Sequence, residues 1–152
     1  MTIQGSRVLW HLLIIGVIIK NTPTLDPLSI LLNSKVLIMK EGAEIRAFLT
    51  LKKIGKTLEL GTVYTMPAWR SKGFSKQLIE YAIQTHQHHV HKGLLCKPKL
   101  VLFYQKLGFE VSNSCGFIID IRRQLFNLFL SPLTRYKIVS MKYTGELINS
   151  DR

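Results

Sequence analysis

Residues 57–83 decide the fold, and they read TLELGTVYTMPAWRSKGFSKQLIEYAI. Apolar residues alternate with polar ones before Pro67, as in a half-buried strand, and a basic turn follows at residues 70–75. Beyond the turn, apolar residues recur at the three- and four-residue spacing of one helix face. The stretch therefore predicts a strand, a basic glycine turn and an amphipathic helix.

The turn has the composition of an anion-binding site. The first N–H groups of a helix have no intrahelical partner and lie at the positive end of the helix dipole, so small residues there form a phosphate cradle. Gly73 allows a close approach of the backbone, while Arg70, Lys72 and Lys76 add positive charge. An ordinary basic connection between a strand and a helix explains the same residues, so both interpretations stay open.

A second segment supports the anion-binding interpretation through a family resemblance. The string P-x-x-R-x-x-G-x-S at residues 67–75 resembles the acetyl-CoA signature Arg/Gln-x-x-Gly-x-Gly/Ala of the GNAT superfamily of N-acetyltransferases. Downstream, FYQKLGF at residues 103–109 is similar to the Phe-Tyr-x-x-x-Gly-Phe segment of that superfamily, and the two segments occur in the family's order. The chain departs from the signature at Ser75, where the family has a smaller residue.

The charge of the chain favours a polyanionic partner. Its 152 residues carry 21 Lys and Arg and nine acidic residues, a formal net charge of +12. Residues 51–110 hold ten of the basic and three of the acidic residues, and so supply +7. A phosphate-rich cofactor and a nucleic acid both fit this excess. The proportions of hydrophobic residues (47%) and charged residues (20%) indicate a globular chain.

Other features exclude broad classes of protein. Cys96 and Cys115 are too few for a disulfide scaffold, and reduced, buried thiols are expected. The apolar run at residues 8–19 is shorter than the roughly 20 residues of a membrane span and is followed by no signal-peptide cleavage site, which favours a buried helix and no transmembrane segment. The histidines of residues 86–91 have no neighbouring Cys or carboxylate, so no metal site is predicted.

The first half of the fold is predicted as a helical N-terminal part, residues 1–35, followed by an antiparallel meander. The meander has three predicted strands: residues 36–40, 45–51 and 57–67. In the third strand, Gly61 indicates a bulge or the close approach of another backbone or a ligand. The N-terminal part is predicted to contain a helix at residues 7–20 and a helical turn at residues 28–33.

The second half is predicted as strand–helix–strand–helix–strand. A helix is expected from Phe74 to about His91, with Gly93 as its C-terminal stop. The elements expected after it are a strand at residues 94–96, a helix at 98–107, a strand from 109 and a strand at 139–143. The pattern predicts a single α+β domain over residues 1–152, and the resemblance implies a GNAT-like mixed central sheet flanked by helices.

Residues 112–137 form an insert before the last strand, and it is long for a loop. Leu125, Leu128 and Phe129 share a helical face within it. Three interpretations stay open: an additional packing helix, a lid over a substrate groove, and a helix on a membrane surface. The GNAT family also opens with a strand, and residues 1–6 are scarcely long enough for one.

The resemblance implies acetyl-CoA as co-substrate and an amine as acceptor. Backbone groups of the strand end and of the turn should hold the cofactor, the strand end along the pantetheine arm and the turn at the pyrophosphate. The residues assigned to the cofactor are Val63, Tyr64, Thr65, Arg70, Ser71, Lys72, Gly73, Phe74, Ser75 and Lys76. Trp69 either covers the cofactor or packs against the sheet.

Two residues are candidates for proton transfer. By resemblance, Tyr104 is the general acid that protonates the leaving thiolate, although a tyrosine on the apolar face of a helix is also commonly part of the core. Glu59 is the only carboxylate of the central strand and is the candidate base, with a solvated strand residue as the alternative. The sequence therefore predicts a cytoplasmic N-acetyltransferase, or else a non-catalytic basic module of this fold that binds CoA, RNA or an acidic partner.

Overall fold

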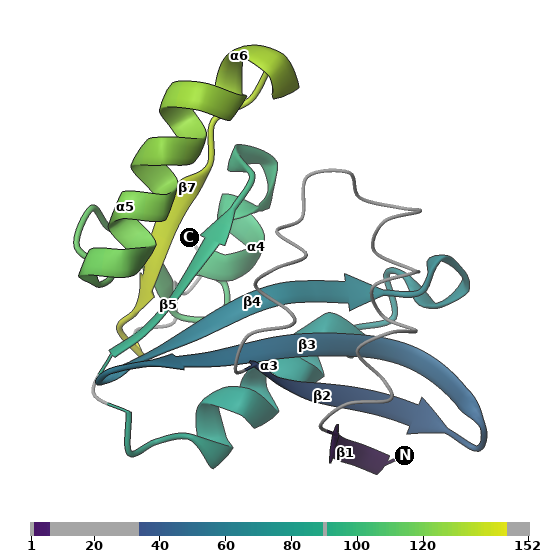
Figure 1. Cartoon of the computed structure of the whole chain (residues 1–152). Coiled ribbons are helices and arrows are strands. Elements are labelled where there is room, and N and C mark those ends of the chain that lie inside the picture. The colour runs from purple at the N-terminus through teal and green to yellow at the C-terminus, as the bar shows by residue number, and fades with distance from the viewer. Residues whose placement is uncertain (1, 7–33, 90, 146–152) are drawn as a thin grey trace, which may run out of the picture. The chain divides into compact units, whose positions relative to one another are not determined.

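The computed structural model describes residues 2–6, 34–89 and 91–145 (Figure 1). The chain divides into two compact units, residues 1–53 with 60–87, and residues 54–59 with 88–152. The helices predicted at residues 7–20 and 28–33 lie outside the described residues.

Seven strands are described in chain order. They are β1 (Thr2–Ser6), β2 (Ser34–Glu41), β3 (Glu44–Ile54), β4 (Thr57–Thr65), β5 (His91–Cys96), β6 (Phe109–Val111) and β7 (Val139–Tyr143). Their hydrogen-bonded order in the sheet is β1-β2-β3-β4-β5-β7-β6. The predicted class, a mixed sheet with helices in an α+β fold, is confirmed.

The described residues also form helical elements. They are η1 (Pro67–Trp69), α3 (Phe74–Thr85), η2 (Pro98–Leu100), α4 (Val101–Gln105), α5 (Phe117–Leu125), η3 (Phe126–Leu130) and α6 (Ser131–Thr134). Of the described helices, none combines the length and the apolarity that crossing a membrane requires.

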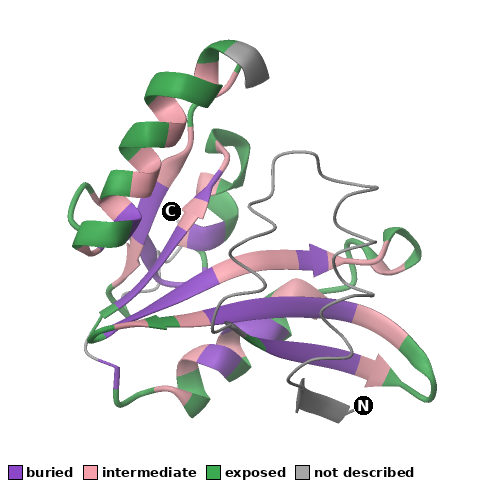
Figure 2. Ribbon diagram, in the orientation of Figure 1, coloured by how far each residue is buried: buried purple, intermediate pink, exposed green. Residues whose placement is uncertain are grey.

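The meander of the first unit forms as the sequence predicts. β2 pairs antiparallel with β3, and positive φ angles at Gly42 and Gly55 make the two tight turns of the meander. The middle residues of β2 and β3 are buried in an unbroken run, which means that both sheet faces are covered there. Figure 2 shows this run as the buried centre of the unit.

The first strand of the unit corrects the expectation that residues 1–6 are too short. Thr2–Ser6 form β1, which pairs antiparallel with β2 over all five residues. An edge strand needs only one partner, and β2 supplies a full-length template for it. The predicted N-terminal part, residues 1–35, therefore begins with a strand and ends inside β2.

The helix α3 ends earlier than predicted. It stops at Thr85, not near His91, because His86 leaves the helical conformation with φ −122° and ψ 40°. The hydroxyl of Thr85 donates to the Tyr81 carbonyl at 2.7 Å, which satisfies an acceptor of the last turn. Leu78, Ile79 and Ala82 form the buried face of α3, which packs on β2, but this apolar pattern does not extend into the histidines.

Gly93 is not the stop of α3, because it lies inside β5. A Cβ at this position would lie 3.3 Å from Ile119 Cδ1 and 3.4 Å from Cys115 Cβ, so the glycine allows α5 to approach the strand closely. In the second unit, β7 pairs antiparallel with both β5 and β6. The strands expected at residues 94–96, from 109 and at 139–143 are confirmed, and Gly108, between α4 and β6, has a left-handed φ of 81°.

The helices α4 and α5 lie on opposite faces of the β5–β7 pair. The side chains of Cys96 and Met141 share one face of the pair, since the Cys96 Sγ lies 3.6 Å from the Met141 Sδ. Tyr104 of α4 is buried beside Cys96 on this face. Gly93, an odd number of residues away in the same strand, faces Ile119 of α5. Figure 1 shows α5 running alongside β7.

Candidate active site

The turn between β4 and α3 leaves the start of the helix open to solvent. Gly73 is the N-cap and has φ 80°, a left-handed backbone that glycine adopts without steric cost. Within the described residues no side chain caps this helix, so its first N–H groups keep the unpaired donors of a helix start. Arg70, Lys72 and Lys76 are exposed beside them. Donors and charges of this kind suit a phosphate group.

Ser75 connects the start of α3 to the end of β4. Its Oγ lies 2.6 Å from Thr65 Oγ1, and Arg70 Nε donates to the Thr65 carbonyl at 3.4 Å. Ser71 completes the turn with a left-handed φ of 60°. The serine that departs from the acetyl-CoA signature therefore makes a hydrogen bond that glycine cannot make.

The end of β4 that is predicted to meet the pantetheine arm is only partly covered. Val63 and Thr65 are half-buried, whereas Tyr64 is buried with its ring stacked on Phe48 at a centroid distance of 5.4 Å. Met66 N–H donates to the Arg46 carbonyl at 2.9 Å, so pairing with β3 continues to the last residue before Pro67. One edge of the strand end is thus occupied by β3.

Trp69 packs among cationic side chains. The guanidinium carbon of Arg46 lies 3.2 Å from its ring centroid, and Lys72 Nζ lies 4.3 Å from it. Arg46 comes from β3 and also pairs with Glu41. The contact with Arg46 favours the packing role of Trp69, and the pair was not predicted because the two residues lie in separate elements.

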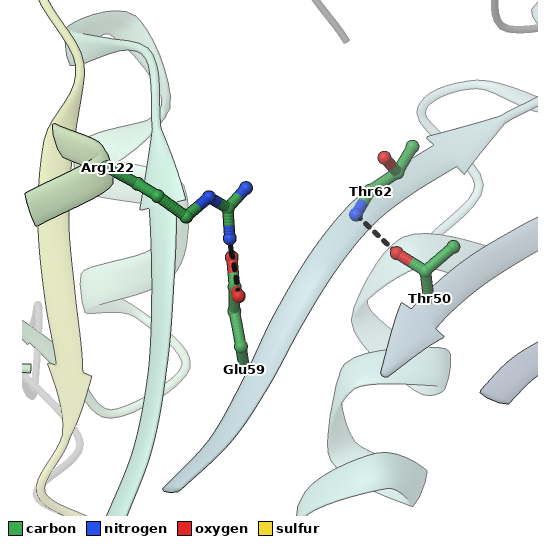
Figure 3. Close-up of polar contacts among 4 residues, drawn as sticks. All are labelled: Thr50, Glu59, Thr62 and Arg122. Atoms are coloured by element: carbon green, nitrogen blue, oxygen red, sulfur yellow. Dashed lines mark hydrogen bonds and ion pairs between the residues drawn. The ribbon is translucent and has the colours of Figure 1, made fainter. Parts of the chain in front are cut away.

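Gly61 marks the close approach of a neighbouring side chain. A Cβ at Gly61 would lie 2.4 Å from Thr50 Oγ1, and the same hydroxyl accepts a hydrogen bond from the Thr62 N–H at 2.7 Å (Figure 3). A side-chain oxygen of β3 thus takes the place of a backbone acceptor at this point of β4. A close approach at Gly61 was predicted, but the group that approaches is a threonine side chain and not the backbone or ligand that was expected.

Glu59 is buried and ion-paired. Its side chain is 3% exposed, and Arg122 Nη1 lies 2.7 Å from each of its carboxylate oxygens (Figure 3). Arg122 belongs to α5, 63 residues further along the chain. A carboxylate held in this way has its lone pairs engaged by a cation. The role of Glu59 as a base stays a prediction, and the ion pair with Arg122 gives this residue a structural role as well.

Tyr104 lies in the core of the second unit. The residue is 6% exposed, and its ring meets that of Phe109 at a centroid distance of 6.0 Å with the planes nearly perpendicular. Burial, and to a smaller extent the neighbouring Cys96, raises the pKa of its hydroxyl well above its usual value. The raised pKa makes this hydroxyl a weaker acid than that of an exposed tyrosine, which suits a hydrogen-bond donor.

The two thiols and the histidines of residues 86–91 provide no further reactive cluster in the part of the chain that the structure describes. Burial raises the pKa of Cys96 to about 11 and also raises that of Cys115, so both thiols stay protonated at neutral pH. His86 bonds to the Ala82 carbonyl at 3.1 Å, and the rings of His88 and His89 lie 4.3 Å apart with their planes tilted by 40°. The described residues contain no group of three His, Cys, Asp or Glu side chains arranged to hold a metal ion.

The predicted site residues divide between the two units. The cofactor-binding set, residues 63–65 and 70–76, lies in the first unit, and Glu59 and Tyr104 lie in the second. Residues 63–65 are the end of β4, and residues 70–76 form the turn and the first residues of α3, so their role in binding the cofactor stays a prediction. Arg122 is the residue that sequence reasoning missed, because no local pattern connects it with Glu59.

Comparison with known families identifies the class of protein that this fold and turn define. The model of the acetyltransferase (GNAT) domain matches residues 33–111, more than half of the chain. The chain therefore belongs to the GNAT family of N-acetyltransferases. The match covers both the turn before α3 and the segment that contains Tyr104. No curated protein matches the sequence.

Solved structures share the fold at low sequence identity. An IAA acetyltransferase from Bacillus cereus is 12% identical, with a TM-score of 0.68 over 93% of this chain and 99% of the other. The ribosomal-protein-S18-alanine N-acetyltransferase from Escherichia coli is 11% identical, with a TM-score of 0.70 over 99% and 97%. A Bacillus subtilis acetyltransferase solved in complex with CoA is 17% identical, with a TM-score of 0.67 over 93% and 96%.

Proposed function

We propose that this chain transfers an acetyl group from acetyl-CoA to a primary amine of a small molecule or a protein in the cytoplasm. The open start of α3 carries the proposal. Gly73 holds its left-handed turn, no side chain in the described residues caps the helix, and three basic residues surround it. The CoA complex of a structure with the same fold supports the choice of cofactor.

In this reaction the residues 71–76 bind the pyrophosphate through backbone N–H groups, and Arg70 and Lys72 add charge. Acetyl-CoA supplies a thioester, an activated acyl group. The amine attacks as its neutral form, loses one proton, and the thiolate that leaves must gain one. Binding the two reactants side by side supplies much of the rate enhancement, so few side chains are required.

Tyr104 is the proposed donor to the leaving sulfur. A tyrosine hydroxyl is protonated at neutral pH, and burial makes this one a weaker acid still, so it offers the sulfur a hydrogen bond throughout the reaction. Glu59 is the proposed base, directly or through water. To act as a base, the Glu59 carboxylate must give up part of its bonding to Arg122 and accept a proton from the amine.

The test measures cofactor binding and thiol release separately. We expect calorimetry to show binding of acetyl-CoA to the full chain, weakened roughly tenfold in an Arg70→Ala/Lys72→Ala variant through the loss of two phosphate-facing charges. The matched control is Lys99→Ala/Lys106→Ala, which removes two exposed charges of the second unit. Absence of binding at millimolar acetyl-CoA would contradict the proposal.

A specific observation favours a second candidate, a member of the family that binds CoA without turnover. Both oxygens of Glu59 are engaged by Arg122, so the only carboxylate of β4 is not open to an amine. Release of free CoA thiol in the presence of a panel of amines separates the two candidates. Turnover that falls in Tyr104→Phe supports the enzyme, and binding without thiol release supports the second candidate. Salt-dependent binding of RNA in place of CoA would support a basic nucleic-acid module.

A further inference from the structure

The insert presents its apolar residues outward. Its exposed side chains form what we call the outer face, defined by Phe117, Ile118, Ile121, Leu125, Leu128 and Phe129. Phe117 is 79% and Leu128 68% exposed, and their spacing places them on one side of the helical run. Figure 2 shows this run as exposed over most of its turns.

Three polar residues of the same insert are engaged in bonds within the fold. Arg122 pairs with Glu59, Asp120 accepts hydrogen bonds from the Cys115 and Gly116 N–H groups at 3.3 Å each, and Asn127 exchanges two bonds with the Ile138 backbone. Only Ile119 of α5 is buried. An ordinary surface helix has the reverse polarity, with its apolar stripe against the core. An exposed apolar patch of this kind marks an interaction surface.

Charge identifies the kind of surface that the outer face fits. The described residues of the second unit carry ten Lys and Arg against three acidic residues, a net charge of +7. Two of the three acidic side chains, Glu59 and Asp120, are engaged in the bonds given above. Two copies of such a unit repel each other, whereas an anionic lipid surface attracts it.

Basic residues also lie at both ends of the outer face. Ile54 and Gly55 line one apolar cavity of about 290 Å³ together with Phe117 and Ile118, and the next residue in that turn is the exposed Lys56. At the other end, Arg135 and Lys137 are exposed after α6. Apolar side chains flanked by cations are the features of a helix that lies in the membrane interface.

We propose that the insert binds the surface of an anionic membrane, with the outer face in the headgroup region and the flanking cations on the lipid phosphates. This binding is independent of acetyl transfer.

The test is co-sedimentation of the full chain with vesicles of phosphatidylcholine that contain about 30% phosphatidylglycerol. We expect the parent to bind, and a Leu128→Gln/Phe129→Gln variant to bind at least about tenfold more weakly because two inserted apolar side chains are lost at unchanged charge. The control is Leu102→Gln, since Leu102 is 73% exposed on α4, on the opposite face of the β5–β7 pair. It should bind as the parent does.

Three outcomes would overturn the proposal. The first is a parent that does not bind these vesicles, and the second is a double variant that binds as well as the parent, since charge alone then explains the attraction. The third is a parent that sediments as a dimer without lipid while the double variant is a monomer, which assigns the outer face to a second copy of the chain. Circular dichroism of each variant checks that both fold, and the exposure of the two substituted residues makes retention of the fold the expected result.

Discussion

The turn before α3 and the insert use polar groups in opposite ways. The turn offers backbone donors and basic side chains to solvent, and its own bonds are few and local, such as Ser75 with Thr65. In the insert, Arg122 bonds inward to a buried carboxylate, whereas most of the apolar side chains are exposed. A region that binds a small anion needs open donors, whereas the helical run of the insert exposes mainly apolar side chains and has cations only at its ends.

The strongest test of this contrast is removal of the cation that faces inward. Arg122→Ala leaves Glu59 buried without its ion-pair partner, and we expect it to lower the free energy of unfolding by about 3 kcal/mol. Urea unfolding measures the change. Glu59→Leu/Arg122→Met, which replaces both charges by apolar groups, should recover most of the loss. An Arg122→Ala variant as stable as Arg135→Ala, an exposed control, would show that the inward charges contribute nothing.

A second test concerns the strand that leads to the turn. Gly61→Ala brings a Cβ within 2.4 Å of Thr50 Oγ1, and we expect a loss of about 2 kcal/mol through overpacking. Thr50→Ala removes the hydroxyl that fills this space. The loss in the double variant should therefore be smaller than the sum of the two single losses, as measured by thermal unfolding. Additive losses would contradict the close approach.

The turn itself is tested by its left-handed glycine. Gly73→Val forces a β-branched residue to φ 80°, a strain of about 1–2 kcal/mol, and should reduce acetyl-CoA affinity because the N–H groups of the turn lose their arrangement. Gly42→Val is the matched control, since Gly42 has φ 59° in a hairpin turn with open space around it. We expect both variants to lose similar stability and only Gly73→Val to lose calorimetric affinity. Equal loss of affinity would remove the special role of the turn.

The smallest expected effect is in the alkaline stability of the second unit's core. Burial raises the pKa of Cys96 from 9.0 to about 11, so above pH 9.0 the unfolded chain loses a proton that the folded chain keeps. The contribution of Cys96 is therefore fully present below pH 9.0 and is lost as the pH rises through about 11. Cys96→Ala should flatten this part of the urea-midpoint profile. An unchanged slope would indicate that the thiol is not buried as described.

The sequence was sufficient for the elements that local patterns define. The alternation along residues 45–51 and the glycine turns predicted the meander, and the spacing from Pro67 to Ser75 predicted the turn before α3. The end of α3 was placed too late because the hydrophobic spacing does not show where Thr85 and His86 close the last turn. β1 was doubted because it forms on the template of β2 and not through its own pattern.

The pairs that cross the chain were beyond sequence reasoning for a physical reason. Arg122 and Glu59 are 63 residues apart, and only the packed fold brings an arginine of the insert to the buried carboxylate. Periodicity predicted a helical face at Leu125, Leu128 and Phe129, but a period gives the width of an apolar stripe and not the direction in which it points. That the apolar face of the insert points outward is shown only by the structure, in which these side chains are exposed while Arg122 bonds to Glu59.

The most direct test of the central claim, that the open start of α3 binds acetyl-CoA, is an amide NMR titration of the full chain with acetyl-CoA. We expect the N–H signals of Gly73, Phe74, Ser75 and Lys76 to shift most and to saturate together, because these are the donors without intrahelical acceptors. Saturating cofactor that leaves these four signals in place, or that moves only signals of the second unit, would contradict it.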